Sequence, residues 1–152
     1  MDFHPEVIEF QLLFSNSTYN SSSNGYNESY NSYGNNSVIY AEIRFAPLKH
    51  VFKGLSLDEV VESVLKGLAK KSLKTNLILC MMRGDKEEDN IKVVDLAERF
   101  LNRGVVALDL AGAESIYKTI DYKNLFAYAK GKNIPFTTHA GEADGKDSMK
   151  QL

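Results

Sequence analysis

The stretch TNLILCMMRGDKEEDNIKVVDLAERFLNRGVVALDLAG, residues 75–112, decides the fold. It begins with a run that is almost entirely apolar from 77 to 82, which predicts a strand over 75–84 that is buried on both faces. The segment 87–104 is acidic at its start and ends on Arg and Gly, as helix-dipole and C-cap preferences favour, and it predicts a helix. A second apolar strand over 105–112 completes a β-α-β unit.

The same alternation continues on both sides of this unit. VIYAEIRFAP predicts a strand over 38–47, and the segment 54–71 predicts an amphipathic helix that a capping box at Ser56 can start. Further along the chain, 121–133 predicts a third helix and 134–142 a fourth strand. Strands that are joined by helices of this length imply crossover connections and a parallel sheet.

Two architectures fit a parallel sheet of this kind, a doubly wound open sheet and a (β/α)8 barrel. The Gly-rich phosphate-binding turn that follows the first strand of many doubly wound sheets is absent here. Polar residues lie instead at the carboxyl ends of all four predicted strands, where barrel enzymes build their sites: Glu42, Arg44, Arg83, Asp85, Asp109, Glu114, His139 and Glu142. These signals favour an α/β fold, a partial (β/α)8 TIM barrel of about four parallel strands with three intervening helices. The doubly wound sheet stays open as the alternative.

Composition divides the chain into three parts. Residues 1–14 form an N-terminal stub, in which 7–14 could be the remainder of a helix. Residues 15–37 are a low-complexity Ser/Asn/Tyr segment without aliphatic side chains, and we predict that it is disordered because it cannot bury enough apolar surface. The regular pattern occupies 38–152.

Charge and cysteine content exclude several classes of protein. The formal net charge of -2 argues against a general nucleic-acid or membrane partner, and no apolar run reaches the roughly 20 residues that cross a bilayer. The N-terminus shows no secretory signal, and the single Cys80 suits a reducing, cytoplasmic setting. We expect Cys80 to be a buried core residue and His50 to be a solvated loop histidine.

The fourth predicted strand ends in the most informative residues, His139, Gly141 and Glu142. Gly141 permits a tight turn, which could bring the Glu142 carboxylate back toward the His139 imidazole. A neutral imidazole beside a carboxylate suits metal-activated water chemistry. The spacing alone favours a histidine that is satisfied by hydrogen bonds at a strand end and a solvated glutamate, and the metal-site interpretation stays open beside it.

Four motifs taken together are more specific than this spacing. The segments YAEIRFAP (40–47), LILCMMRGD (77–85), VVALDLAGAE (105–114) and FTTHAGEADG (136–145) resemble the adenosine deaminase family, in the family's order. The resemblance covers about residues 38–152. It implies a (β/α)8 barrel and zinc-assisted hydrolytic deamination of adenosine to inosine and ammonia in purine salvage, with a small purine nucleoside as the partner. A relative that deaminates adenine or another 6-aminopurine is the nearest alternative.

The resemblance also implies roles for single residues. His139 matches the histidine that binds zinc, and Glu142 matches the glutamate that protonates a purine ring nitrogen. Gly112 matches the glycine whose backbone meets a purine ring nitrogen. Asp109 and Arg44 lie in family motifs as supporting residues.

The chain also departs from the family pattern. The H-x-H pair of zinc ligands has no counterpart, since His4 is the only histidine before the first predicted strand, and the family's later histidine and aspartate motifs would fall beyond position 152. We therefore expect that the chain alone binds zinc poorly and is inactive. The alternative from another class is a non-catalytic half-barrel that self-associates or binds a partner through open sheet edges at 38–45 and 134–138.

Overall fold

The computed structural model describes residues 39–70 and 73–150, together with the backbone of 8–11. The low-complexity segment predicted at 15–37 lies outside the described residues, as does most of the N-terminal stub. Within the described ranges, no helix is both long and apolar enough to cross a bilayer.

The described strands form one sheet in the order β1 (Ile8–Gln11), β2 (Tyr40–Phe45), β3 (Lys74–Met82) and β4 (Val105–Ala111). Strands β2, β3 and β4 are parallel, as the sequence predicts, and β1 pairs antiparallel with β2. The interpretation of residues 7–14 as the remainder of a helix is therefore wrong for 8–11, the part of that range that the structure describes. Because β1 pairs with Glu42–Phe45, that part of the sheet edge that we expected to be open at 38–45 is covered.

Three helices follow the parallel strands: α2 (Leu57–Leu68), α3 (Glu87–Phe100) and α4 (Lys123–Gly131). The predicted capping box starts α2, because the Ser56 side chain accepts a bond from the Glu59 amide and the Glu59 carboxylate accepts one from the Ser56 amide. The described residues also contain three short 3-10 turns, η3 (Pro47–His50), η4 (Thr119–Tyr122) and η5 (Ser148–Lys150).

The end of α3 differs from its prediction. The helix stops at Phe100, and a turn leads into β4, in which Asn102 has φ 62° and Gly104 has φ 109°. A glycine with positive φ commonly lies directly after the last residue of a helix. Here the helix has already ended at Phe100, and Gly104 lies at the end of the turn that leads into β4.

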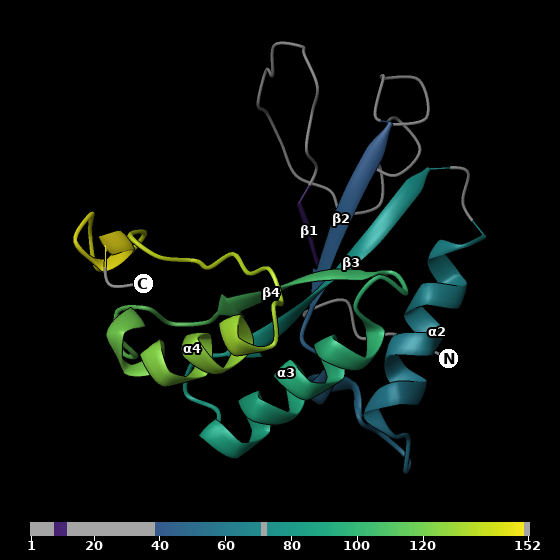
Figure 1. Cartoon of the computed structure of the whole chain (residues 1–152), viewed down its shortest axis with the longest axis horizontal. Coiled ribbons are helices and arrows are strands. Elements are labelled where there is room, and N and C mark those ends of the chain that lie inside the picture. Colours follow the sequence, from purple (N-terminus) through teal and green to yellow (C-terminus); the bar gives the residue numbers. More distant parts are fainter. Residues whose placement is uncertain (1–7, 12–38, 71–72, 151–152) are drawn as a thin grey trace.

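All three helices lie along the same face of the sheet (Figure 1). The side chains between them form one apolar core, which contains alternate residues of each parallel strand: Ile43, Phe45, Leu77, Leu79, Met81, Leu108 and Leu110. A doubly wound sheet would carry helices on both faces. Helices on one face, with polar groups on the other, fit a segment of a TIM barrel.

The fourth predicted strand is only partly formed. Residues 134–139 run beside β4 and make three backbone hydrogen bonds with it, and a single bridge joins Leu108 to Phe136. Pro135 has no amide hydrogen to donate, which limits regular pairing. The expectation of four parallel strands is thus corrected to three, with 134–139 along the edge. Association through this edge stays a prediction.

Two single-residue predictions have opposite outcomes. Cys80 is buried, with 6% of its surface exposed, as expected. His50 is only 7% exposed, and its ring lies 5.8 Å from that of Phe45 and 6.5 Å from that of Phe52. The prediction that His50 is solvated is wrong, because the turn η3 folds it back against the apolar side of the sheet.

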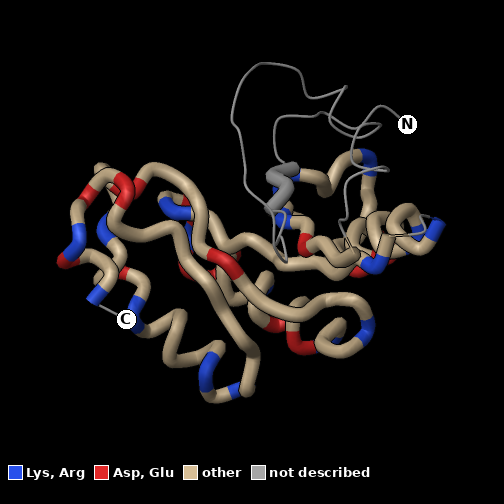
Figure 2. Tube along the Cα trace, turned by 90° about the horizontal axis from the view of Figure 1, so that it is seen from above, with Lys and Arg blue, Asp and Glu red and all other residues tan. Residues whose placement is uncertain are grey.

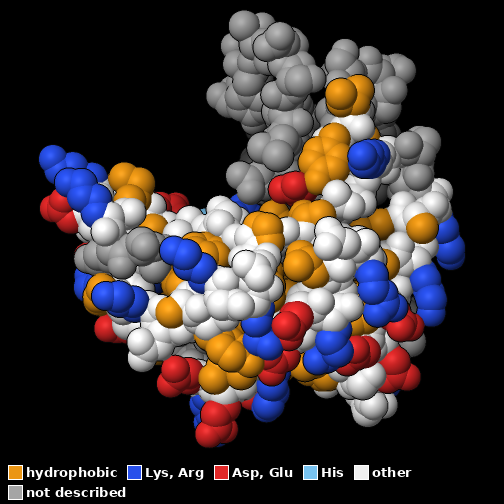
Figure 3. Space-filling model, in the orientation of Figure 1, with side chains coloured by type: hydrophobic (Ala, Val, Ile, Leu, Met, Phe, Trp, Pro, Cys, Tyr) orange, Lys and Arg blue, Asp and Glu red, His pale blue; other side chains and the backbone are white. Residues whose placement is uncertain are grey.

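Charge is distributed over the surface without one dominant sign. Acidic and basic residues are interspersed along the trace (Figure 2), and both signs line the lower rim in Figure 3, where the helices run. This mixture agrees with the small formal net charge of -2.

Candidate functional site

The face of the sheet opposite the helices carries a buried polar cluster around Asp109. Strand alternation places Arg44 of β2, Cys80 of β3 and Asp109 of β4 on this face. Arg44 Nη1 donates to Asp109 Oδ2 at 3.1 Å, and Cys80 Sγ lies 3.8 Å from the same oxygen. Asp109 is 0% exposed and Arg44 is 8% exposed, so the Arg44 guanidinium compensates a carboxylate that water does not reach.

His139 joins this cluster from the edge segment. Its Nδ1 lies 3.0 Å from Asp109 Oδ2, within ion-pair distance. A carboxylate close to one ring nitrogen of a histidine is a common feature of metal-binding histidines, in which the other ring nitrogen holds the ion. The structure therefore brings His139, Asp109 and Arg44 together at the carboxyl ends of the strands.

The backbone of His139 is held on two sides. Its amide donates to Leu110 O of β4 at 3.2 Å, and its carbonyl accepts a bond of 2.6 Å from Arg83 Nη2. Arg83 is 5% exposed, follows β3 directly and stacks over the ring of Tyr122 at 5.6 Å. The position of the imidazole is thus fixed by two neighbouring strand ends.

Gly112 lies at the point where the end of β4 passes the end of β3. Its φ is 111°, and a Cβ at this position would lie 3.1 Å from Arg83 Cβ and 3.3 Å from Arg83 N. A side chain would be strained by the backbone conformation and crowded by the neighbouring strand. The fold therefore favours glycine at position 112. The resemblance separately implies that the Gly112 backbone contacts a purine ring nitrogen.

Glu142 lies apart from His139. Gly141 has φ 86°, so the predicted tight turn is formed. The Glu142 side chain is exposed, and it makes no hydrogen bond or ion pair with any residue of the described ranges. The structure thus places His139 and Glu142 on one short loop without bringing their side chains into contact.

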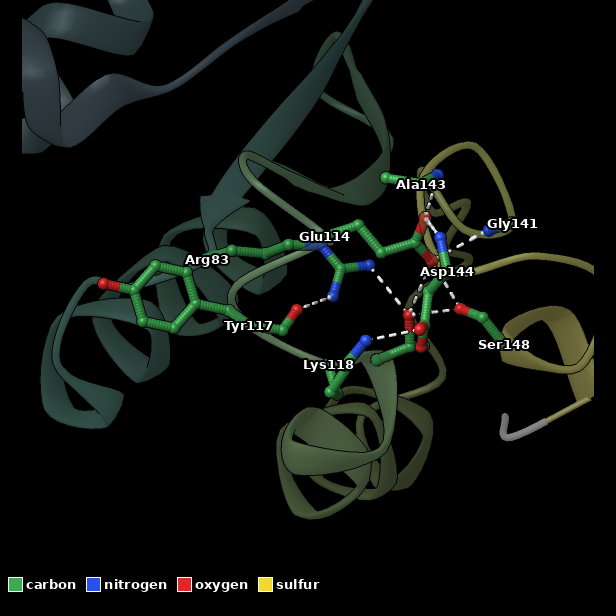
Figure 4. Close-up of polar contacts among 9 residues, drawn as sticks. Arg83, Glu114, Tyr117, Lys118, Gly141, Ala143, Asp144 and Ser148 are labelled. Atoms are coloured by element: carbon green, nitrogen blue, oxygen red, sulfur yellow. Dashed lines mark hydrogen bonds and ion pairs between the residues drawn. The ribbon is translucent and has the colours of Figure 1, made fainter.

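Glu114 is the residue whose importance the sequence did not reveal. Its carboxylate is 5% exposed and accepts bonds from the amides of Gly141 at 2.8 Å, Ala143 at 2.9 Å and Asp144 at 3.3 Å, and from the Ser148 hydroxyl (Figure 4). The bond from Ser148 and those from the amides lower the pKa of Glu114 to about 2, against the opposing effect of burial. These partners in the loop lie 27 to 34 residues away, and most are backbone amides, so no side-chain pattern in the sequence indicates them.

The described residues do not complete a metal site. No group of three or more His, Cys, Asp or Glu side chains in these ranges is arranged to hold an ion. His139 has the arrangement of a metal-binding imidazole, but it supplies one ligand where a zinc site uses three or four protein ligands. A metal at this place would need ligands from elsewhere in the protein.

A surface cavity of about 200 Å³ lies beside the end of β3. It is lined by Asp85, Glu87, Asn90, Asp121, Tyr122 and Leu125. None of the proposed site residues lines it, so this depression is separate from the cluster around Asp109.

Comparison with known proteins identifies the family. The family model described as "Adenosine deaminase" matches residues 27–152. The adenosine deaminase of Haemophilus ducreyi is 44% identical over 123 residues, which are 75% of this chain and 36% of that protein. The adenosine deaminase of Enterococcus faecalis is 43% identical over 109 residues, which are 69% of this chain and 32% of that protein.

Solved structures show the same relationship. The crystal structure of Arabidopsis ADAL complexed with IMP has a TM-score of 0.66 at 26% identity and covers 74% of this chain and 36% of its own. The N6-methyl-AMP deaminase from Arabidopsis thaliana has a TM-score of 0.65, also at 26% identity, over 74% of this chain and 37% of its own. This chain spans about a third of the length of the curated relatives above. The chain belongs to the adenosine deaminase family.

Proposed function

We propose that this chain forms part of the active site of a hydrolase that deaminates adenosine to inosine and ammonia. The observation that carries the proposal is the His139–Asp109–Arg44 cluster at the carboxyl ends of parallel strands. In barrel enzymes that end of the sheet holds the reactive groups. The relatives at 43% and 44% identity are named adenosine deaminase, which favours a nucleoside substrate over the nucleotide that the plant relative is named for.

In this proposal His139 is one ligand of a zinc ion whose other ligands come from elsewhere in the protein. Zinc, when bound, supplies an activated water. Asp109 orients the imidazole through Nδ1, and Arg44 donates to the same carboxylate oxygen. The chain's own contribution is thus to fix the direction of Nε2.

Two further residues complete the proposed site. Glu142 donates a proton to the purine ring nitrogen, which makes the ring carbon more open to attack by water. Gly112 contacts a purine ring nitrogen through its backbone, directly after the end of β4. The exposed position of the Glu142 side chain leaves it accessible to a ligand.

The test is deamination of adenosine by the full-length protein, followed as ammonia release, with metal content measured on the same samples. Glu142→Gln should lower kcat by about 10²- to 10⁴-fold while zinc is retained, because only the proton donor is removed. His139→Ala should lose zinc. Glu88→Gln, the same change at an exposed position of α3, is the matched control and should alter neither.

Two results would contradict the proposal. The first is a folded full-length protein that releases no ammonia from adenosine. The second is a Glu142→Gln variant that keeps the wild-type rate. Release of ammonia from adenine but not from adenosine would instead support the 6-aminopurine alternative.

A further inference from the structure

The loop of residues 139–148 carries both His139 and Glu142, yet it contains almost no regular secondary structure. Only the turn η5 begins at its end, at Ser148. A loop of this kind has few hydrogen bonds of its own, and its geometry must be fixed by groups outside it. Two buried charged side chains supply them.

The first is Glu114, which follows β4. One carboxylate oxygen, Oε1, accepts from the Gly141 amide at 2.8 Å, and the other, Oε2, accepts from the Ala143 amide at 2.9 Å. These two amides flank Glu142 in the chain. The carboxylate therefore holds the backbone on both sides of the proposed proton donor, through the Gly141 and Ala143 amides (Figure 4).

The second is Arg83, which follows β3. Its Nη2 donates to the His139 carbonyl at 2.6 Å, and its Nη1 donates to the Tyr117 carbonyl at 2.8 Å. The guanidinium thus holds the start of the same loop. Arg83 and Glu114 act on adjoining stretches, His139 and Gly141–Asp144.

A single hydroxyl connects the two charges. Thr119 Oγ1 accepts from Arg83 Nη2 at 2.9 Å and lies 3.3 Å from Glu114 Oε1, to which it donates. Thr119 is 0% exposed and Ser148, which also donates to Glu114, is 1% exposed. Buried charges are costly unless hydrogen bonds compensate them, and here the compensating groups belong largely to the loop.

We propose that Glu114 and Arg83 are positioning residues, which clamp the loop of residues 139–148 so that His139 and Glu142 are held at fixed places in the site. The catalytic part of this inference rests on the proposed deaminase function. The clamp itself is a statement about the loop and can be tested without any activity.

The first experiment measures amide hydrogen exchange across residues 140–148 in the full-length protein. Glu114→Gln replaces one acceptor oxygen by an NH2 group that faces backbone donors, so exchange in this loop should rise at least 10-fold while the strands stay protected. Glu114→Asp keeps the charge and should restore part of the protection. Glu142→Gln, in the same loop but without hydrogen bonds, is the matched control and should leave exchange unchanged.

The second experiment measures deamination kinetics and metal content for the same variants. Glu114→Gln should lower kcat by about 10- to 100-fold with zinc retained and KM changed less than about threefold, because it misplaces a group that acts in the transition state. Glu114→Asp should recover part of kcat. A role confined to folding would lower the active fraction without this rescue and without a local rise in exchange.

The outcomes separate the two proposals. If the wild type does not deaminate adenosine but Glu114→Gln raises exchange in the loop, the proposed function fails and the clamp stands. If Glu114→Gln leaves loop exchange at the wild-type level, the clamp is overturned whatever the activity. Should Glu114→Gln fail to fold, Ser148→Ala removes one donor only and should raise loop exchange by a smaller factor. Unchanged exchange in Ser148→Ala would then also overturn the clamp.

Discussion

The same strands form both faces of the sheet, but the two faces bury different kinds of side chain. On the helix side, alternate residues such as Leu79 and Leu108 are 0% exposed and meet only other apolar side chains. On the opposite side, their neighbours Cys80 and Asp109 are also buried, at 6% and 0% exposed, and meet polar groups. Neighbouring residues of one strand therefore lie in different environments, the apolar core on one face and the polar cluster around Asp109 on the other.

The difference lies in how each face tolerates change. Apolar contacts are non-directional, so the helix side depends on volume and buried area. The Asp109 side depends on distances, since a buried carboxylate without its partner loses the group that compensates its charge. Substitutions on the two faces should accordingly fail in different ways.

The largest effect is expected on the polar face. Asp109→Leu leaves the Arg44 guanidinium, 8% exposed, without its carboxylate and should lower the free energy of unfolding by about 3–5 kcal/mol. Urea denaturation of the full-length protein measures this change. The double variant Arg44→Met with Asp109→Leu is the control, and it should be more stable than Asp109→Leu alone, because the charge that lost its partner is removed. A double variant that is less stable than the single one would contradict the pairing.

The second effect is on the apolar face. Leu79→Ala deletes a fully buried side chain from the centre of the core and should lower the free energy of unfolding by about 2–5 kcal/mol. Ile39→Ala, at a position 72% exposed beside β2, provides the comparison and should change it by less than about 0.5 kcal/mol. No second substitution should rescue Leu79→Ala as Arg44→Met rescues Asp109→Leu. Equal costs for the two alanine variants would show that the helix-covered face is not the core.

The apolar face could be predicted from the sequence almost completely. Runs such as 77–82 and the capping box at Ser56 are local signals, and they gave three parallel strands and three helices. The strand β1 was missed because its four residues, IEFQ, are too few for their alternation of apolar and polar side chains to separate strand from helix. The fourth strand failed because Pro135 and an edge position limit pairing in ways that composition does not show.

The polar face could be predicted only as a list of residues. Asp109, His139 and Glu114 all stood at strand ends, and the resemblance suggested roles for the first two. That His139 meets Asp109 depends on how the edge segment aligns with β4, which no local pattern encodes. That Glu114 binds Gly141 and Ala143 depends on backbone amides, which every residue except proline offers, so the sequence gives no side-chain signal for it.

His50 is an exception to the division between the two faces, because it is a polar residue packed on the apolar side, against the ring of Phe45. Burial lowers the pKa of His50 below its ordinary value of 6.5. Above pH 6.5 the imidazole is neutral in both the folded and the unfolded chain. As the pH falls below 6.5 the unfolded chain binds a proton that the folded chain does not, so the free energy of unfolding decreases.

His50→Gln, which does not titrate, should remove this part of the pH dependence. The difference in stability between about pH 7.5 and pH 5.5, measured by urea denaturation, should be smaller in the variant than in the wild type. At neutral pH the titration contributes nothing, so this is the smallest of the three effects there. Equal pH dependence in both proteins would mean that His50 is reached by water, and the apolar side would then end at Phe45 rather than include the turn η3.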